Sequence, residues 1–524
     1  MSHESSVSPF SRIMPSLVGL LAIIPPLHAD PPPNILLIVS EDNGPELGCY
    51  GDSCAQTPRL DQLAAEGLLF ENAYVPQAGC SQSRASFLTG LYPHQHGQIG
   101  LATWGFRLYR EDTPNLPGQL KAAGYRTGLI GKLHINPAES FPFDLHEIRG
   151  ANFQRTDLAQ YARQAKAFIN ADAAPFFLSV NYPDAHDPWL RQVNGLPENP
   201  LSAEDVRVMD YMGVDSSGLR ELVADYYNCL ARLDRLVGDL LDELDASGKR
   251  DNTIVIYLGD HGADMLRGKR TCYEGGLRIP LLIRGPGITP QVRRELVSTL
   301  DLMPTLLAAA GAAPVDGLAG DRLQPLFRAE PADWRSHFCA EYHTHATAPN
   351  YFPQRSIRSQ RYKLIESLLP DTVHPDYEKT MEKLEGDFAR RNRGPLDLPA
   401  VIAASRPIVR SAYQTMQRPP RYQLYDLAQD PHEFRNLADD PAHKHVFRDL
   451  QRRLQNWRMQ TSDPLLDENK LQQLTREVQS VRKRTVARKH DWQYPRYLKR
   501  DRASEPAADV HGRSETPASR RAPD

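Results

Sequence analysis

The stretch Asn34-Ile35-Leu36-Leu37-Ile38-Val39-Ser40-Glu41-Asp42 passes directly from apolar residues into two carboxylates. A short apolar run that is rich in β-branched residues is typical of a strand buried on both faces of a parallel sheet. In open α/β sheets, ligands bind at the carboxyl ends of such strands. The stretch therefore predicts a buried strand that delivers Glu41 and Asp42 to a polar site.

Similar strand-like runs recur along the chain and alternate with helical patterns. The runs at 125–130, 176–180 and 253–258 are apolar, whereas 116–123 and 222–244 carry apolar residues at helical spacing. This alternation is the signature of βαβ units. We therefore expect an α/β fold in which a mainly parallel sheet is flanked by helices.

Each of these runs is followed by polar residues. Lys132 and His134 follow the first run, His186 follows the second, and Asp260 and His261 follow the third. Any one of these side chains, taken alone, is more often a solvated or structural loop residue. Because the carboxyl ends of parallel strands meet at one edge of a sheet, we expect the whole set to form a single site.

The length of 524 residues exceeds what one hydrophobic core usually holds, so we expect more than one domain. We place a catalytic domain over 30–330 and a smaller α+β domain over 331–466, which completes the substrate pocket. Residues 467–524 are basic and then rich in Ala, Ser, Pro and Arg, a composition that predicts a disordered tail. We interpret its basic clusters as a solvated helix face rather than a polyanion site.

Residues 1–29 have the features of an export signal. Arg12 precedes an apolar run from Met14 to Ile24, and the small residue Ala29 follows two prolines. The run is shorter than the roughly 20 apolar residues of a membrane span, so we expect no stable span. The alternative is a disordered leader. We expect a periplasmic or extracellular protein.

Composition excludes few classes of function. The net charge of −3 gives no general attraction to nucleic acid, and we expect no such partner. The six cysteines include no Cys-x-x-Cys pair, which argues against the usual thiolate zinc site. If one cysteine is modified, five remain, so no dense disulfide framework is implied.

One cysteine lies in a distinctive motif, Gly79-Cys80-Ser81-Gln82-Ser83-Arg84-Ala85-Ser86-Phe87-Leu88-Thr89-Gly90. Taken alone, a Cys-x-x-Ser-Arg pattern is more often a buried cysteine where a loop meets a helix. A second composite gives the motif its specificity: Asp260-His261-Gly262 follows a buried strand and precedes a segment from Lys269 to Pro280.

These motifs resemble those of the type I sulfatases of the alkaline phosphatase superfamily, over residues 34–467. Within that superfamily, the chain is most similar to the heparan N-sulfatase (N-sulfoglucosamine sulfohydrolase) group. The resemblance implies an alkaline-phosphatase-like sheet and a smaller C-terminal α+β domain. The narrower similarity rests on Arg267-Gly268-Lys269, Glu341-Tyr342-His343, Tyr351-Phe352-Pro353, Leu424-Tyr425-Asp426-Leu427, Asp430-Pro431-His432-Glu433, Asn436-Leu437-Ala438 and Ser462-Asp463-Pro464.

The resemblance implies two cofactors. A maturation enzyme would oxidise Cys80 to formylglycine, whose hydrate binds the metal and attacks sulfur. The metal would be Ca²⁺, a hard cation that prefers oxygen ligands. Asp42, Asp260 and His261 would surround it, with Glu41 in the position that the family normally fills with Asp.

The resemblance also implies a role for each catalytic residue. Arg84 would hold the hydrate, and Lys132 and Lys269 would neutralise charge that grows on the sulfate. His134 would take the proton from the second hydrate oxygen. His186 would contact the sulfate or protonate the leaving nitrogen or oxygen.

A further set of residues is predicted to bind substrate. We expect three arginines after Tyr351 (Arg355, Arg358 and Arg361), with His343 and His345, to lie over the pocket and bind a sugar carboxylate or a neighbouring sulfate, because arginine binds planar anions bidentately. Arg267 belongs to the same predicted set.

Two positions depart from the family pattern. Gln82 replaces the usual Pro or Ala, so conversion of Cys80 is expected to be less efficient or to need a different maturation enzyme. Glu41 is one methylene longer than Asp, so it would shift the metal or coordinate it differently.

The sequence therefore predicts a calcium-dependent sulfatase that acts on N-sulfoglucosamine of heparan-type glycans, in glycosaminoglycan degradation. The alternatives are an O-sulfatase on another sulfated glycan, a phosphatase or phosphonate-ester hydrolase of the same superfamily, and a non-catalytic binder of sulfated glycans. The choice between an S–N and an S–O bond stays open, as does the oligomeric state.

Overall fold

A computed structural model describes residues 31–391 and 393–499 of the chain. The predicted signal peptide, residues 1–29, lies outside this part. Within the described residues, none of the helices has the length and apolar character that crossing a membrane requires.

The main sheet has eight strands in the order β10-β2-β9-β7-β1-β6-β4-β5. Strand β9 runs antiparallel to both of its neighbours, and the other strand pairs are parallel. The predicted α/β fold with a mainly parallel sheet is confirmed. The strands are β1 (Asn34–Ser40), β2 (Leu68–Phe70), β4 (Arg126–Gly131), β5 (Leu145–Glu147), β6 (Phe176–Asn181), β7 (Thr253–Gly259), β9 (Leu281–Arg284) and β10 (Gln291–Arg293).

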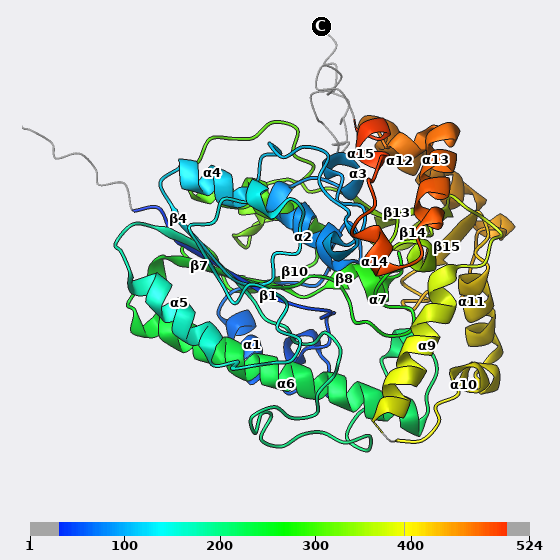
Figure 1. Ribbon diagram of the computed structural model, residues 1–524, viewed down its shortest axis with the longest axis horizontal. Coiled ribbons are helices and arrows are strands. Elements are labelled where there is room, and N and C mark those ends of the chain that lie inside the picture. The colour runs from blue at the N-terminus through cyan, green and yellow to red at the C-terminus, as the bar shows by residue number, and fades with distance from the viewer. Residues whose placement is uncertain (1–30, 392, 500–524) are drawn as a thin grey trace, which may run out of the picture. The chain divides into compact units, whose positions relative to one another are not determined.

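Helices cover both faces of this sheet (Figure 1). Because side chains alternate across a strand, Leu36 and Ile38 of β1 pack in a core with helices α1, α5 and α6. Ile35 and Leu37 face the opposite core, with α2, α4 and α8. The helices are α1 (Pro58–Ala65), α2 (Cys80–Thr89), α4 (Leu116–Ala122), α5 (Gln160–Asn170), α6 (Ser217–Ala246) and α8 (Leu302–Ala309).

The register of the strands aligns their carboxyl ends. Val39 of β1 pairs with Asn181 of β6, which also pairs with Gly131 of β4. On the other side of β1, Ser40 pairs with Gly259 of β7. The residues that follow β1, β4 and β7 therefore leave the sheet at one level, as the sequence predicts.

A second, antiparallel sheet has the order β12-β13-β14-β15. Helices α9, α10 and α11 are inserted between β14 and β15, and α12 follows β15. The position of the predicted domain boundary near residue 330 stays a prediction. These elements are β12 (His337–Tyr342), β13 (Gln354–Ser359), β14 (Tyr362–Ser367), α9 (Pro375–Arg390), α10 (Leu398–Ala404), α11 (Pro407–Gln417), β15 (Tyr422–Asp426) and α12 (Lys444–Gln460).

Short elements complete the described chain. A three-stranded sheet has the order β11-β3-β8. The short elements are β3 (Ala73–Tyr74), α3 (Pro93–His96), α7 (Glu274–Leu277), β8 (Arg278–Ile279) and β11 (Val297–Ser298).

The predicted disordered tail is wrong for residues 468–498. They include α13 (Glu468–Ser480), α14 (Arg484–Ala487) and α15 (Tyr494–Tyr497). Leu471, Leu474 and Val478 recur at helical spacing on one face of α13 and pack with Phe106 and Tyr351. This apolar face is the reason for the order, and the basic composition of the segment obscures it. Residues 500–524 lie outside the described part.

This packing can be tested by substitution of Leu474, which is fully buried. We expect Leu474→Ala to lower the free energy of unfolding by about 2–5 kcal/mol, since it removes buried methyl groups and leaves a cavity. Val486→Ala is the matched control, because that side chain is half exposed and should cost less than about 0.5 kcal/mol. Urea denaturation measures both, and equal effects would contradict the packing.

Candidate active site

Cys80 is the first residue of helix α2, and it lies at the aligned strand ends. Its side chain is only 2% exposed, and its Sγ lies 3.4 Å from Nε2 of His261. Burial raises the pKa of the thiol, but the charges of Lys132 and Lys269 outweigh burial, and the pKa lies well below its usual value. The site thus favours negative charge at this position.

Two buried lysines approach the carboxylates that follow β1. Lys132 Nζ lies 2.6 Å from Oε2 of Glu41. Lys269 Nζ lies 2.9 and 3.0 Å from the two oxygens of Asp42. Burial raises the pKa of Glu41 even though Lys132 opposes this effect. Each cation is therefore held by a carboxylate beside Cys80.

Arg84 lies one turn further along α2 and fixes the helix to three strand ends. Its Nε donates to Oδ2 of Asp260 at 3.1 Å, and its Nη1 donates to Oδ1 of Asn181 at 2.7 Å. The same Nη1 donates to the carbonyl of Lys132 at 2.9 Å. Cys80 is held in register with the sheet by these bonds.

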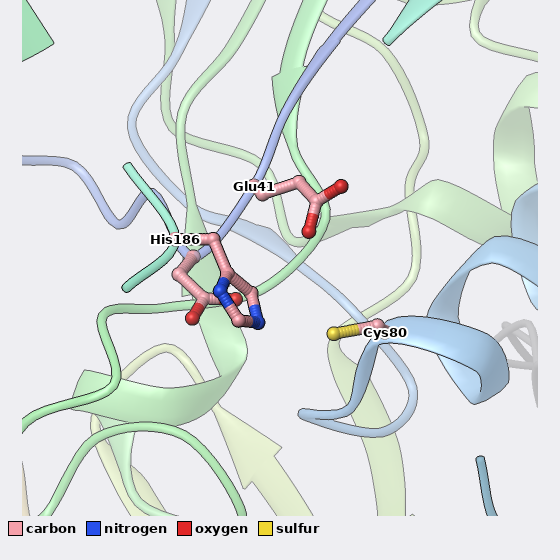
Figure 2. A group of neighbouring side chains, drawn as sticks. Glu41, Cys80 and His186 are labelled. Carbon is pink, nitrogen blue, oxygen red and sulfur yellow. The ribbon is translucent and has the colours of Figure 1, made fainter. Parts of the chain in front are cut away.

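Two histidines complete the surroundings of Cys80. Burial and the charge of Lys132 lower the pKa of His134 to about 4, so this imidazole is uncharged near pH 7. The His186 ring points toward the Cys80 sulfur, with the Glu41 carboxylate beside them (Figure 2). His186 stacks on Phe153 with ring centroids 3.9 Å apart.

The loop that carries His186 is anchored by a buried ion cluster. Asp184 accepts hydrogen bonds from Arg155 Nε at 2.9 Å and from Arg232 Nε at 2.8 Å. Arg155 also donates to the carbonyl of His186. This cluster fixes the loop backbone, which limits the positions open to the imidazole.

The donor set around Cys80 fits a hard divalent cation. Ligand atoms of Glu41, Asp42, Cys80 and His186 lie within 4.8 Å of one another, as do those of Cys80, Asp260 and His261. Oε1 of Glu41 is buried without a hydrogen-bond partner among the described residues, and Arg84 Nη2 lies 3.6 Å from it. Carboxylate oxygens are the ligands that calcium prefers.

The Nε2 edge of the His261 ring faces the potential metal ligands Cys80 and Asp42. Its Nδ1 lies 2.9 Å from the carbonyl of Gly262, so Nδ1 carries the hydrogen and Nε2 faces Cys80 and Asp42. Burial lowers the pKa of His261, but the charge of Asp260 outweighs burial and raises it to about 9.

Comparison with known proteins identifies the family. Residues 33–312 match the family model described as Sulfatase, and residues 259–378 match that described as N-sulphoglucosamine sulphohydrolase, C-terminal. The chain belongs to the sulfatase family. The predicted enzyme class, a sulfuric ester hydrolase, is confirmed, and so is the predicted resemblance to the heparan N-sulfatase group.

Individual relatives agree with this assignment. The sulfatase is 32% identical to human N-sulphoglucosamine sulphohydrolase over 492 residues, which cover 86% of this chain and 94% of the relative. It is 30% identical to human arylsulfatase A over 476 residues, which cover 81% and 87% of the two chains. A solved structure of a protein in complex with its substrate D-glucosamine-2-N,6-O-disulfate superposes with a TM-score of 0.59 at 20% identity, covering 82% of this chain and 98% of that one. That structure supports the fold alone.

Among the predicted substrate-binding residues, His345 interacts electrostatically with both Cys80 and Lys269. The side chain is half-buried, and burial together with the charge of Lys269 holds its pKa well below the usual value. His343 is fully buried, with Nε2 3.5 Å from Oε2 of Glu341. Both residues follow β12.

Arg355 and Arg267 do not lie over an open pocket, contrary to the prediction. Arg355 is 0% exposed and donates from Nε and Nη2 to the two oxygens of Asp463, each at 2.8 Å. Arg267 is also buried and donates to the carbonyls of His432 and Glu433. Both guanidinium groups instead join segments of the interior, because a buried cation needs fixed acceptors.

The sequence reasoning missed a group of ion pairs contributed by α9. Lys383 Nζ lies 3.1 Å from Oδ1 of Asp187 and also contacts Asp264. Arg270 donates to Asp264 at 2.6 Å and to Asp376 at 2.8 Å. No local motif marks Lys383, because a lysine on an amphipathic helix is usually a solvated one.

Gln82, which departs from the family motif, has a structural role in the folded sulfatase. Its Nε2 donates to the carbonyl of Thr344 at 2.6 Å and to that of Ile99 at 3.3 Å. Thr344 lies between His343 and His345. Gln82 therefore ties the helix of Cys80 to the segment that carries these histidines.

The corrected role of Arg355 gives a test. We expect Arg355→Ala to lower the free energy of unfolding by about 3–5 kcal/mol, because it leaves Asp463 buried without its bidentate partner. Arg294→Ala is the control, since the exposed Arg294–Glu71 pair should contribute less than about 1 kcal/mol. Denaturant titration measures both variants. A stable Arg355→Ala protein with a raised Michaelis constant would restore the substrate-binding role.

Proposed function

We propose that this sulfatase removes sulfate from a sulfated sugar, most favourably the sulfamate group of N-sulfated glucosamine in heparan-type glycans. The observation that carries the chemistry is the buried Cys80, whose Sγ lies among two lysines and three histidines. The substrate class is supported by the 32% identity to N-sulphoglucosamine sulphohydrolase across 94% of that protein.

Two groups that the family uses would complete the site. Converted to formylglycine, Cys80 supplies a hydrated aldehyde as the nucleophile. Calcium would supply positive charge that stabilises the sulfate, and Asp42, Asp260, Glu41 and His261 would hold it. The orphaned buried oxygen of Glu41 and the carboxylate-rich donor set support this assignment.

The chain's own residues then act on the substrate. Lys132 and Lys269 bind the sulfate and offset charge that develops as the bond to sulfur breaks. His186 donates a proton to the leaving nitrogen or oxygen, and His134 accepts a proton from the side chain at position 80. Arg84 holds that side chain in line. The products are inorganic sulfate and the free amine or alcohol, with one water consumed.

We also propose that the protein is exported and that a formylglycine-generating enzyme acts on it before folding. In the folded chain all residues of α2 are buried. A maturation enzyme that binds the peptide on both sides of Cys80 therefore requires an unfolded chain, in which the amide of Gln82 is free of its partners.

Mass spectrometry tests the maturation of Cys80. In protein purified from its native host, the peptide that spans Cys80 should be lighter by about 18 mass units than the thiol form. The peptide that carries Cys54 is the internal control and should keep its thiol mass. An unmodified Cys80 in an active enzyme would contradict the proposal.

Activity tests the reaction. The enzyme should release sulfate from N-sulfoglucosamine, and Cys80→Ala should lower turnover by at least about a thousandfold, as loss of a nucleophile does. Cys54→Ala is the matched control and should retain activity. If only O-sulfated glucosamine is hydrolysed, the O-sulfatase alternative holds. If no sulfated sugar is hydrolysed although formylglycine is present, the substrate class is wrong.

Thermal unfolding tests the calcium site without reference to activity. After treatment with a chelator, added Ca²⁺ at about 100 times its dissociation constant should stabilise the fold by about 2.7 kcal/mol, or a Tm rise of about 2 °C or more. Asp260→Asn should abolish this rise, whereas Asp242→Asn, on the exposed face of α6, should keep it. An equal rise in both variants would contradict the site.

A further inference from the structure

A cleft of about 520 Å³ lies next to the loop of His186. One wall is the segment from Asp187 to Arg191, which follows β6. The other walls come from α6 and from the end of α9 with the residues after it. Four arginines line the cleft: Arg191, Arg390, Arg391 and Arg393.

The cleft adjoins the active-site loop at Asp187. This residue lines the cleft, and its Oδ1 lies 3.2 Å from Nδ1 of His186. The same oxygen lies 3.1 Å from Nζ of Lys383. The cleft and the His186 side chain are therefore joined by the loop that follows β6.

Two of the four arginines in the cleft, Arg191 and Arg390, are exposed to solvent. Arg391 and Arg393 both pair with the buried carboxylate of Asp225, and Arg393 also pairs with Glu221. Arg390 contacts Asp387, but its side chain is 71% exposed. Arg191 is exposed, and its guanidinium forms no ion pair with any residue that the structure describes. Guanidinium groups bind sulfate and carboxylate through paired hydrogen bonds.

We propose that this cleft binds a second oxyanion, a sulfate or carboxylate on the sugar next to the one that is hydrolysed. The inference rests on the proposed function, since it extends the substrate from one sugar to a charged oligosaccharide. Lys383 and the shared Asp225 hold the two walls in place, and Arg191 and Arg390 contact the oxyanion from the rim. The sulfatase then prefers substrates with an anionic neighbouring sugar over the monosaccharide.

Steady-state kinetics with three substrates test the proposal. The substrates are N-sulfoglucosamine, the same sugar linked to a uronic acid, and the same sugar linked to a neutral sugar. We expect Arg191→Ala/Arg390→Ala to raise the Michaelis constant for the uronate disaccharide about tenfold, with the other two substrates changed less than twofold. A sulfated uronate and an unsulfated one then show which oxyanion the cleft prefers.

The control is Arg452→Ala, an arginine on α12 with a 67% exposed side chain. It should leave all three substrates unchanged. Equal losses on the monosaccharide and the uronate disaccharide, or no loss on either, would overturn the cleft as a binding site.

A binding measurement separates this inference from the proposed function. If the parent enzyme hydrolyses none of the substrates, the proposed function fails. Calorimetry of Cys80→Ala with an N-sulfated, heparin-derived disaccharide then decides the cleft by itself. An Arg191→Glu change in that background should raise the Kd at least about tenfold relative to Arg452→Ala. An unchanged Kd would overturn the inference.

Discussion

The pairing of buried cations with buried carboxylates at the ends of the parallel strands is the interaction on which the site depends. Lys132 faces Glu41, Lys269 faces Asp42, and Arg84 joins the same cluster through a third carboxylate. A charge that leaves water costs several kcal/mol unless a partner compensates for it. Because the strands end in register, the residues that follow them meet at one level, where these partners pair.

The C-terminal part of the chain also contacts the segments that form the site. Gln82 on the Cys80 helix bonds to the carbonyl of Thr344, and Arg270 bonds to Asp376 on α9. Lys383 reaches Asp187 from the same helix. The second part therefore supplies charged and polar partners to the segments that surround Cys80.

Sequence patterns predicted the site residues that follow the strands. They failed for residues whose role is set by a contact with a segment distant in the sequence. Arg355 has the chemistry of a residue that binds anionic substrates, yet its Nε and Nη2 both donate to Asp463. The basic segment after residue 467 folds because Leu474 and its neighbours on one face of α13 find an apolar surface. Neither outcome is visible from local spacing.

The sequence by itself determined the alternation of strands and helices, the position of Cys80 at a loop-to-helix junction, and the polar residues after each strand. These features are local, since they depend on the period of apolar residues and on short motifs. Only the tertiary structure decided which charges meet. Asp187, Lys383 and Asp264 are separated by up to 196 residues, yet they lie in contact. Ion pairs form between side chains that the packed core brings together, and the separation of two residues along the sequence does not predict the distance between their side chains.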